Sequence, residues 1–192
     1  MASEKIISGI FNGSIPRSER LQIYENAKDQ IRKGLNAEIA REVMHVIDTT
    51  AVPPLQAEYV FMGYCPDAKL ENRQDDIWIK DGICEYNWVS DAKQLSKFDQ
   101  IMVGDTIILK KREIFGETMK IHAHGKITKR ETSDITKKIY FRVDWRVPKE
   151  FLIVPLMACN STVNPRSIEN VERAMHEDFW AWLKEGGEKE QN

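Results

Sequence analysis

The sequence predicts an α+β fold: a small β-barrel flanked by helices and preceded by an N-terminal helical pair. Apolar residues recur at helical spacing near both ends of the chain, whereas alternating and β-branched segments fill the stretch between them. The 192 residues suffice for a barrel with a helical attachment. We therefore expect a helical segment over 1–54, a barrel domain with a C-terminal helix over 55–186, and a disordered tail over 187–192.

The expected helical pair lies within Ser18–Ile47. Gly34 ends the first helix, because glycine adopts the backbone conformation that follows a helix, and Asn36 can cap the second. The order helix, glycine, helix has a faint similarity to a helix-turn-helix motif, but Glu38 would face phosphates poorly. We expect a packing hairpin that offers a surface to a protein partner. A helical adaptor or DNA-binding regulator is a competing function.

Strand patterns occupy the middle of the chain. Aromatic, β-branched or alternating residues predict strands over Glu58–Cys65, Gly104–Lys110, Met119–Lys129 and Lys138–Arg146, and a short edge segment over Leu152–Met157. Asp76–Trp88 is expected to form two short strands around the turn dipeptide Asp81-Gly82. A short helix or turn follows over Ser90–Gln100, and Pro165 and Ser167 open a last helix that ends at Gly186.

The formal net charge of −2 conceals a basic block. The stretch 110–149 holds twelve Lys and Arg against five acids, a net of +7, which leaves −9 for the rest of the chain. Such a block is typical of a polyanion site, and equally of a solvated hairpin face. If it binds phosphates, the expected contacts are Lys110, Lys111, Arg112, Lys129 and Arg130.

Metal and catalytic motifs are sparse. His122 and His124 alternate on one expected strand and should share a face, yet no third ligand recurs near them. The cysteines, at positions 65, 84 and 159, form no CxxC pair, which argues against a thiolate metal site and a disulfide framework. Nucleophile elbow, P-loop and dinucleotide motifs are absent. We expect no cofactor and no catalysis. The competing interpretation is a metal-dependent nuclease or small hydrolase that uses the Asp75–Asp81 region.

Aromatic residues gather in the same half of the chain as the basic block. They are Trp78, Tyr86, Trp88, Tyr140 and Trp145. Nucleic-acid bases stack on such rings at about 1–3 kcal/mol each, and aromatic cages accept methyl groups. Tryptophan in a small barrel is also a usual core residue, so at least two of these five should be buried.

The ordered motifs from about residue 59 to residue 183 resemble the PUA-like superfamily, particularly its EVE-like and YTH-like branch. The matching pieces are Ile77-Trp78, Asp81-Gly82-Ile83 and Tyr86-Asn87-Trp88, then Val103-Gly104-Asp105, and finally Ile121, Gly125-Lys126-Ile127 and Tyr140 to Trp145. The resemblance implies a pseudo-barrel flanked by helices whose pocket accepts a flipped, often modified, base. It therefore implies a DNA or RNA partner and a binding module rather than an enzyme.

The resemblance also directs attention to a set of pocket residues. Trp88 and Trp145 are the expected stacking walls, with Tyr86 and Trp78 beside them. Asn87 and Asp144 are expected to hydrogen-bond the base edge, since an amide offers donor and acceptor and a carboxylate accepts from an exocyclic amine. For Asp144 a buried ion pair with Arg142 or Arg146 remains an alternative.

Location follows from what the chain lacks. No apolar run reaches the roughly 18 residues of a membrane helix. The first residues, which include Glu4, do not form a secretory signal. We expect a cytoplasmic protein without a membrane partner.

Overall fold

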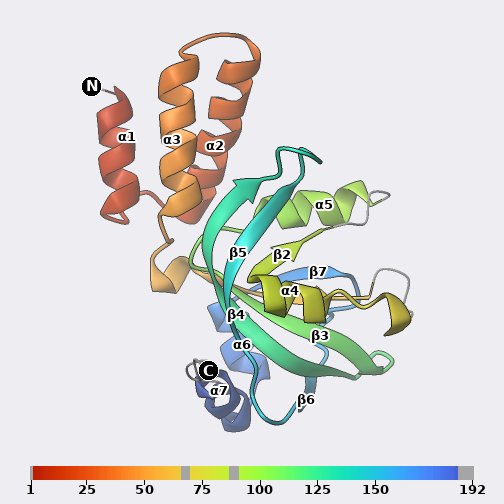
Figure 1. The fold of residues 1–192 in the computed structure, drawn as a ribbon. Helices are drawn as coiled ribbons and strands as arrows, with labels where there is room; N and C mark the ends of the chain where they lie inside the picture. The colour runs from red at the N-terminus through yellow and green to blue at the C-terminus, as the bar shows by residue number, and fades with distance from the viewer. Residues whose placement is uncertain (1, 66–69, 87–90, 186–192) are drawn as a thin grey trace, which may run out of the picture.

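The computed structural model describes residues 2–65, 70–86 and 91–185 (Figure 1). Its helices are α1 (Ala2–Phe11), α2 (Arg17–Arg32), α3 (Ala37–Thr49), α4 (Asp75–Asp81), α5 (Ala92–Asp99), α6 (Ile168–Ala174) and α7 (Glu177–Lys184). Its strands are β1 (Glu58–Gly63), β2 (Ile83–Glu85), β3 (Thr106–Ile114), β4 (Thr118–Thr132), β5 (Ile139–Arg146), β6 (Leu152–Pro155) and β7 (Val163–Ser167). The α+β prediction is confirmed.

The strands form one sheet in the order β2-β5-β4-β3-β1-β7, and β6 pairs with β4 beside this path. Strands β1 and β3 run parallel, with Tyr59 opposite Thr106, and the other pairs are antiparallel. Within the described residues the sheet is open, so the closed barrel expected from the sequence is not found. At the β7 edge the Gln94 side chain of α5 accepts a hydrogen bond from the Val163 backbone N–H (2.7 Å), which satisfies a donor that a closing strand would take.

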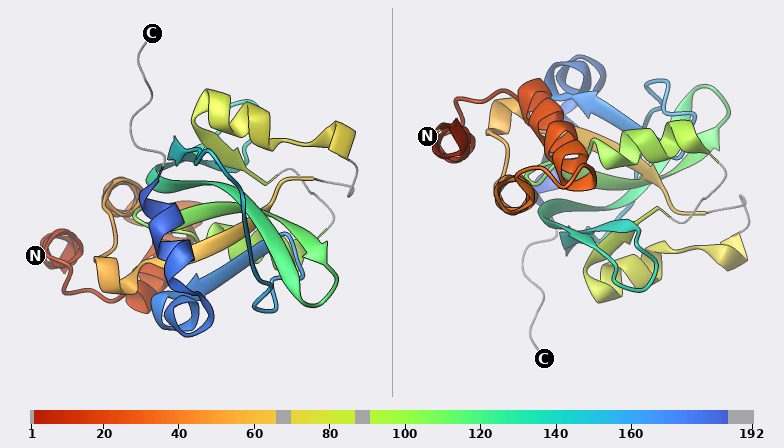
Figure 2. Two further views of the ribbon diagram at one scale, coloured as in Figure 1. Left: turned by 90° about the horizontal axis from the view of Figure 1, so that it is seen from below. Right: turned by 90° about the horizontal axis from the view of Figure 1, so that it is seen from above.

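The two faces of the sheet bury separate cores, because successive residues of a strand point to opposite faces. On β1, Val60 and Met62 enter a first core that also contains residues of α4 and α5. Phe61 enters a second core with Phe179 and Trp182 of α7. Figure 2 shows the sheet between α4 on one side and α6 and α7 on the other.

Strand β4 contains a bulge that changes which face its side chains occupy. Leu109 of β3 pairs with Ala123, but the next residue, Lys110, pairs with Ile121, so His122 is an extra residue without a partner position. Ile121 accordingly belongs to the second core and Ala123 to the first.

The bulge separates the two histidines. His122 lies against Tyr64 and Asp75 on the side of the first core. His124 packs on the indole of Trp182, with ring centroids 5.0 Å apart, on the side of the second core. The expectation that both imidazoles share a face is therefore wrong. The inserted residue, His122, shifts by one position the alternation of side chains between the two faces of the sheet.

The N-terminal helices form a bundle with a third core, which includes Ile10, Tyr24, Val43 and Ile47. The sequence pattern predicted α2 and α3 but not α1. Arg20 is 1% exposed and donates to the Ile10 carbonyl oxygen at 2.7 Å, so it ties the end of α1 to α2.

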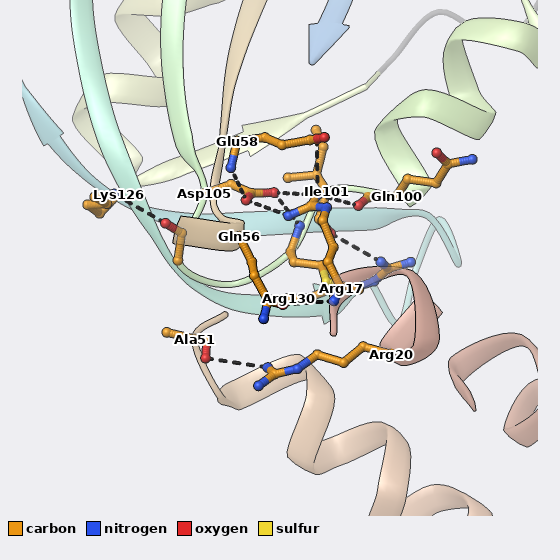
Figure 3. Close-up of polar contacts among 12 residues, drawn as sticks. Arg17, Arg20, Ala51, Gln56, Glu58, Gln100, Ile101, Asp105, Lys126 and Arg130 are labelled. Atoms are coloured by element: carbon orange, nitrogen blue, oxygen red, sulfur yellow. Dashed lines mark hydrogen bonds and ion pairs between the residues drawn. The ribbon is translucent and has the colours of Figure 1, made fainter. Parts of the chain in front are cut away.

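Arginine side chains fasten this bundle to the sheet (Figure 3). Arg17 donates to both carboxylate oxygens of Asp105, at 2.7 and 2.8 Å. Asp105 is fully buried, and it also accepts the backbone N–H groups of Glu58 and Met102. The Asp105 of the Gly104-Asp105 turn is thus a structural anchor of the helical bundle.

Two other element predictions need correction. The first part of Asp76–Trp88 is the helix α4, which buries Trp78 and ends at Gly82, a glycine with φ of 66°. An Asp-Gly pair suits a hairpin turn and a helix end alike, because both need positive φ. Near the C-terminus, Pro165 lies in the edge strand β7, and the expected single helix is divided into α6 and α7 at Met175.

Candidate functional site

A pocket of about 410 Å³ opens beyond the end of β1, where β3 continues past its parallel partner. Its walls come from residues 63–65, from residues 110–113 of β3, from Phe115 in the turn between β3 and β4, and from the loop 160–162. It gathers three of the predicted phosphate contacts, Lys110, Lys111 and Arg112, with two aromatic rings, Tyr64 and Phe115. Basic and aromatic side chains that converge in this way suit a ligand with both charge and planar rings.

The Tyr64 wall is held in place from behind. The His122 ring meets the Tyr64 ring edge to face, with centroids 4.8 Å apart, and the Arg73 guanidinium lies 5.6 Å from the same ring. The carboxylate of Asp75, which is fully buried, accepts from both Arg73 and His122, the latter at 2.8 Å. Asp75 is thus a positioning residue that orders the pocket wall.

Burial alone would raise the pKa of Asp75. The hydrogen bonds from Arg73 and His122 outweigh burial and hold that pKa well below its ordinary value. The carboxylate is therefore charged at neutral pH and already has its partners. Its neighbour Asp76 points to solvent, with 75% of its side chain exposed. Among the residues that the structure describes, no three His, Cys, Asp or Glu side chains gather as metal ligands. In the Asp75–Asp81 region, then, Asp75 supports the wall of the pocket and Asp76 faces solvent.

Lys110 forms the floor of the pocket rather than its rim. Its ammonium donates to the carbonyl oxygens of Cys159 (2.6 Å) and Ser161 (2.9 Å), and the residue is 5% exposed. Burial lowers the pKa of Lys110 to about 8. Asn164 accepts from the Ser161 hydroxyl at 2.7 Å, so the loop that Lys110 contacts is held from both sides. A backbone phosphate would have to displace these partners, so Lys110 is a poor phosphate contact in this structure.

Lys111 and Arg112 are exposed at the rim, where a phosphate can reach them. The Arg112 guanidinium lies 5.6 Å from the centre of the Phe115 ring. Lys111 stands directly opposite Lys120 of β4 in the sheet register. Lys120 does not line the pocket, and its ammonium lies 3.4 Å from the centre of the Phe151 ring.

The other two predicted phosphate contacts lie elsewhere. They are Lys129 and Arg130. Lys129 lies roughly 30 Å along β4 from Lys120, the residue opposite Lys111, because a strand rises about 3.3 Å per residue. Lys129 pairs with Glu131 at 2.6 Å. Arg130 is 7% exposed and donates to the Asp99 carbonyl oxygen at 2.6 Å. The basic block is therefore divided between two ends of the sheet, and the prediction that Arg130 meets phosphate conflicts with its burial.

Most of the expected aromatic pocket belongs to the first core. Trp78, Tyr86 and Trp145 are 0%, 4% and 5% exposed, and Trp145 donates from its indole N–H to the Ile83 carbonyl oxygen. These rings stabilise the sheet and do not line the basic pocket. The expected stacking residue Trp88 and its neighbour, Asn87, lie outside the described residues.

Asp144 and Trp145 point to opposite faces of β5, as adjacent strand residues do, and Trp145 is buried in the first core. Asp144 is exposed and lines a separate cavity of about 260 Å³ with Lys126 and Arg146. The alternative of a buried pair does not hold either, since Arg142 pairs with Glu131 at 2.7 Å.

Sequence reasoning missed Tyr64, Phe115 and the loop 160–162. Phe115 carried a signal, because an aromatic residue beside Gly116 in a hairpin turn buries little and is 85% exposed. Tyr64 carried none, since it follows a buried strand and is itself a member of the first core.

Comparison with known proteins adds no relative. No protein-family model, curated protein or solved structure matches the chain. Over the described ranges, none of the helices combines the length and the apolar character that crossing a membrane would require. The pocket beside β1 and β3 is thus the main structural indication of what this chain binds.

Proposed function

We propose that the chain is a non-catalytic nucleic-acid-binding module, related to the PUA-like superfamily, that takes a flipped and modified base of DNA or RNA into the pocket beside β1 and β3. The observation that carries the proposal is that exposed Lys111 and Arg112 and the exposed ring of Phe115 line one pocket, with the buried Tyr64 behind them. The volume, about 410 Å³, lies in the range of about 300–1,000 Å³ that small-molecule sites occupy.

Each wall of the pocket has a place in this scheme. Phe115, which is 85% exposed, offers a surface on which a base can stack, and Tyr64, which is 6% exposed, closes the pocket from behind. Lys111 and Arg112 bind the phosphates on either side of that base. Glu113, which also lines the pocket, accepts hydrogen bonds only and suits an exocyclic amine of the base.

The relation to PUA-like proteins is part of the proposal. It is supported by the sequence motifs and by a sheet that carries helices on both faces. The open edge at β7 and the N-terminal bundle are departures from the resemblance. The pocket also differs from the one expected, because it uses Tyr64 and Phe115 where the motifs pointed to Trp145.

Titration of labelled oligonucleotides tests the proposal. Fluorescence anisotropy is measured with DNA and RNA, single-stranded and duplex, with and without a methylated base, at about 50 and about 200 mM salt. We expect binding that weakens with salt and that favours one modified strand. The double variant Lys111→Ala, Arg112→Ala should weaken binding to modified and unmodified strands alike and lower the salt slope by about two.

Lys138→Ala is the matched control, since Lys138 is an exposed member of the same basic block and does not line the pocket. Thermal unfolding of each variant verifies that it is folded. The proposal is wrong if no oligonucleotide binds, or if the double variant and the control bind equally well.

A further inference from the structure

The turn between β3 and β4 presents apolar side chains to solvent. Ile114 is 52% exposed and Phe115 is 85% exposed. The turn is tight: the Glu117 N–H donates to the Ile114 carbonyl oxygen at 3.2 Å, and Gly116 has a φ of 80°. In Figure 1 this hairpin points away from α1, α2 and α3. Folding buries almost none of the Phe115 ring, so core packing does not account for it.

Cations outnumber acids around this turn: Lys111, Arg112 and Lys120 lie beside Glu113 and Glu117. Arg112 lies over the Phe115 ring, and Lys111 faces Lys120 one step further along the hairpin. Phe115 also lines the proposed base pocket. The protruding ring, the exposed cations and the pocket are thus parts of one surface, and an approaching polyanion would meet all of them together.

Resting on the proposed function, we propose that Ile114 and Phe115 form a wedge that enters the base stack of a duplex and occupies the place of the base held in the pocket. Proteins that separate stacked bases commonly insert Phe, Leu or Ile between base steps. A base inside a duplex must leave the stack before a pocket can enclose it. A ring that lies at the edge of the pocket is placed to fill the gap as the base leaves.

The wedge makes the ligand class specific. A single strand has no closed stack to open, so it needs the pocket and the cations but not the wedge. A duplex needs all three. We therefore assign a double-stranded target with one extractable base, and the wedge residues should matter more for this form than for a single strand.

A duplex with 2-aminopurine next to the target base tests the assignment, because 2-aminopurine becomes brighter when it is unstacked. DNA and RNA duplexes are used in parallel, together with the matching single strands. The parent protein should raise the fluorescence on binding. Phe115→Ala should remove the rise and weaken duplex binding about tenfold more than single-strand binding, which loses only the Phe115 wall of the pocket. Phe115→Trp should keep the rise.

Ile135→Ala is the matched control: Ile135 is 93% exposed in the turn between β4 and β5 and should change neither reading. Equal weakening of duplex and single strand by Phe115→Ala would overturn the wedge and leave Phe115 as a wall of the pocket. No change in either form would also overturn it. If the parent binds single strands only, the wedge is wrong and the proposed function stands. If it binds neither form, the proposed function fails as well.

Discussion

The contact between Arg17 and Asp105 supports a quantitative prediction about how the helical bundle is held. Arg17 makes two charge-assisted hydrogen bonds to Asp105, donates to the Gln100 carbonyl oxygen at 2.9 Å and lies 3.3 Å from a carboxylate oxygen of Glu58. The Arg17 side chain is 14% exposed and the Asp105 side chain 0%. The perturbation is Arg17→Ala, which leaves a buried carboxylate without its cation.

The magnitude follows from the contacts that remain. Removing one partner of a buried ion pair costs about 3–5 kcal/mol. Asp105 would keep the N–H groups of Glu58 and Met102, both at 2.8 Å, so its charge stays partly compensated. We therefore expect the lower end of the range, about 3 kcal/mol of unfolding free energy.

Urea unfolding followed by circular dichroism measures this loss. The cycle formed by Arg17→Ala, Asp105→Asn and the double variant should give a coupling energy of about 2 kcal/mol, since the residues are in direct contact. Arg32→Ala, an exposed arginine on the same helix, should change stability by less than about 0.5 kcal/mol. A loss below about 1 kcal/mol for Arg17→Ala would refute the argument that this contact anchors the bundle.

Three further predictions concern pH and packing. Because burial lowers the pKa of Lys110 to about 8, below its unfolded value, stability should rise as pH rises from about 8 to about 10; Lys110→Gln should lose this gain in urea curves, and a parent-like rise in the variant would contradict it. Burial raises the pKa of Asp48 to about 6, above its unfolded value, so stability should fall as pH rises from about 4 to about 6. Asp48→Asn should remove that loss of unfolding free energy, up to about 3 kcal/mol, when urea unfolding is measured at about pH 4 and about pH 6. A variant that loses as much stability as the parent between these pH values would disprove it. A Cβ at Gly125 would lie 2.5 Å from the Val143 side chain and 2.7 Å from the Asp144 carbonyl oxygen, so Gly125→Ala should lower stability by about 1–3 kcal/mol in thermal unfolding, and a neutral variant would show that β5 can shift.

Much of the fold could be predicted from local pattern. Strands β1, β3, β4 and β5 and helices α2 and α3 overlap the segments that the residue pattern predicted, although β3 and β4 run further toward the C-terminus. Helix α4, in the first part of Asp76–Trp88, could not be predicted in this way. Its apolar residues are few, and an Asp-Gly pair such as Asp81-Gly82 occurs at helix ends as well as in hairpin turns. Closure of the sheet could not be predicted either. It depends on whether β2 and β7 meet, and no local pattern records that.

The candidate site was predicted only in part, for a related reason. Lys111 and Arg112 follow the buried part of β3 and were identified by their charge. Trp145 was chosen for its chemistry, yet its side chain enters the first core. Residue type states what a side chain can bind, whereas its face on the sheet decides whether a ligand can reach it.

The bulge at His122 shows how one inserted residue sets that face. A strict two-residue period over β4 would place Ile121 and Ala123 on the same side of the sheet, and the partner strand β3 alone determines that they differ. Because of the bulge, β4 supplies the second core before His122 and the first core after it. The same irregularity directs His122 to Asp75 and the back of Tyr64, so the pocket wall depends on a register shift that the sequence of β4 does not reveal by itself.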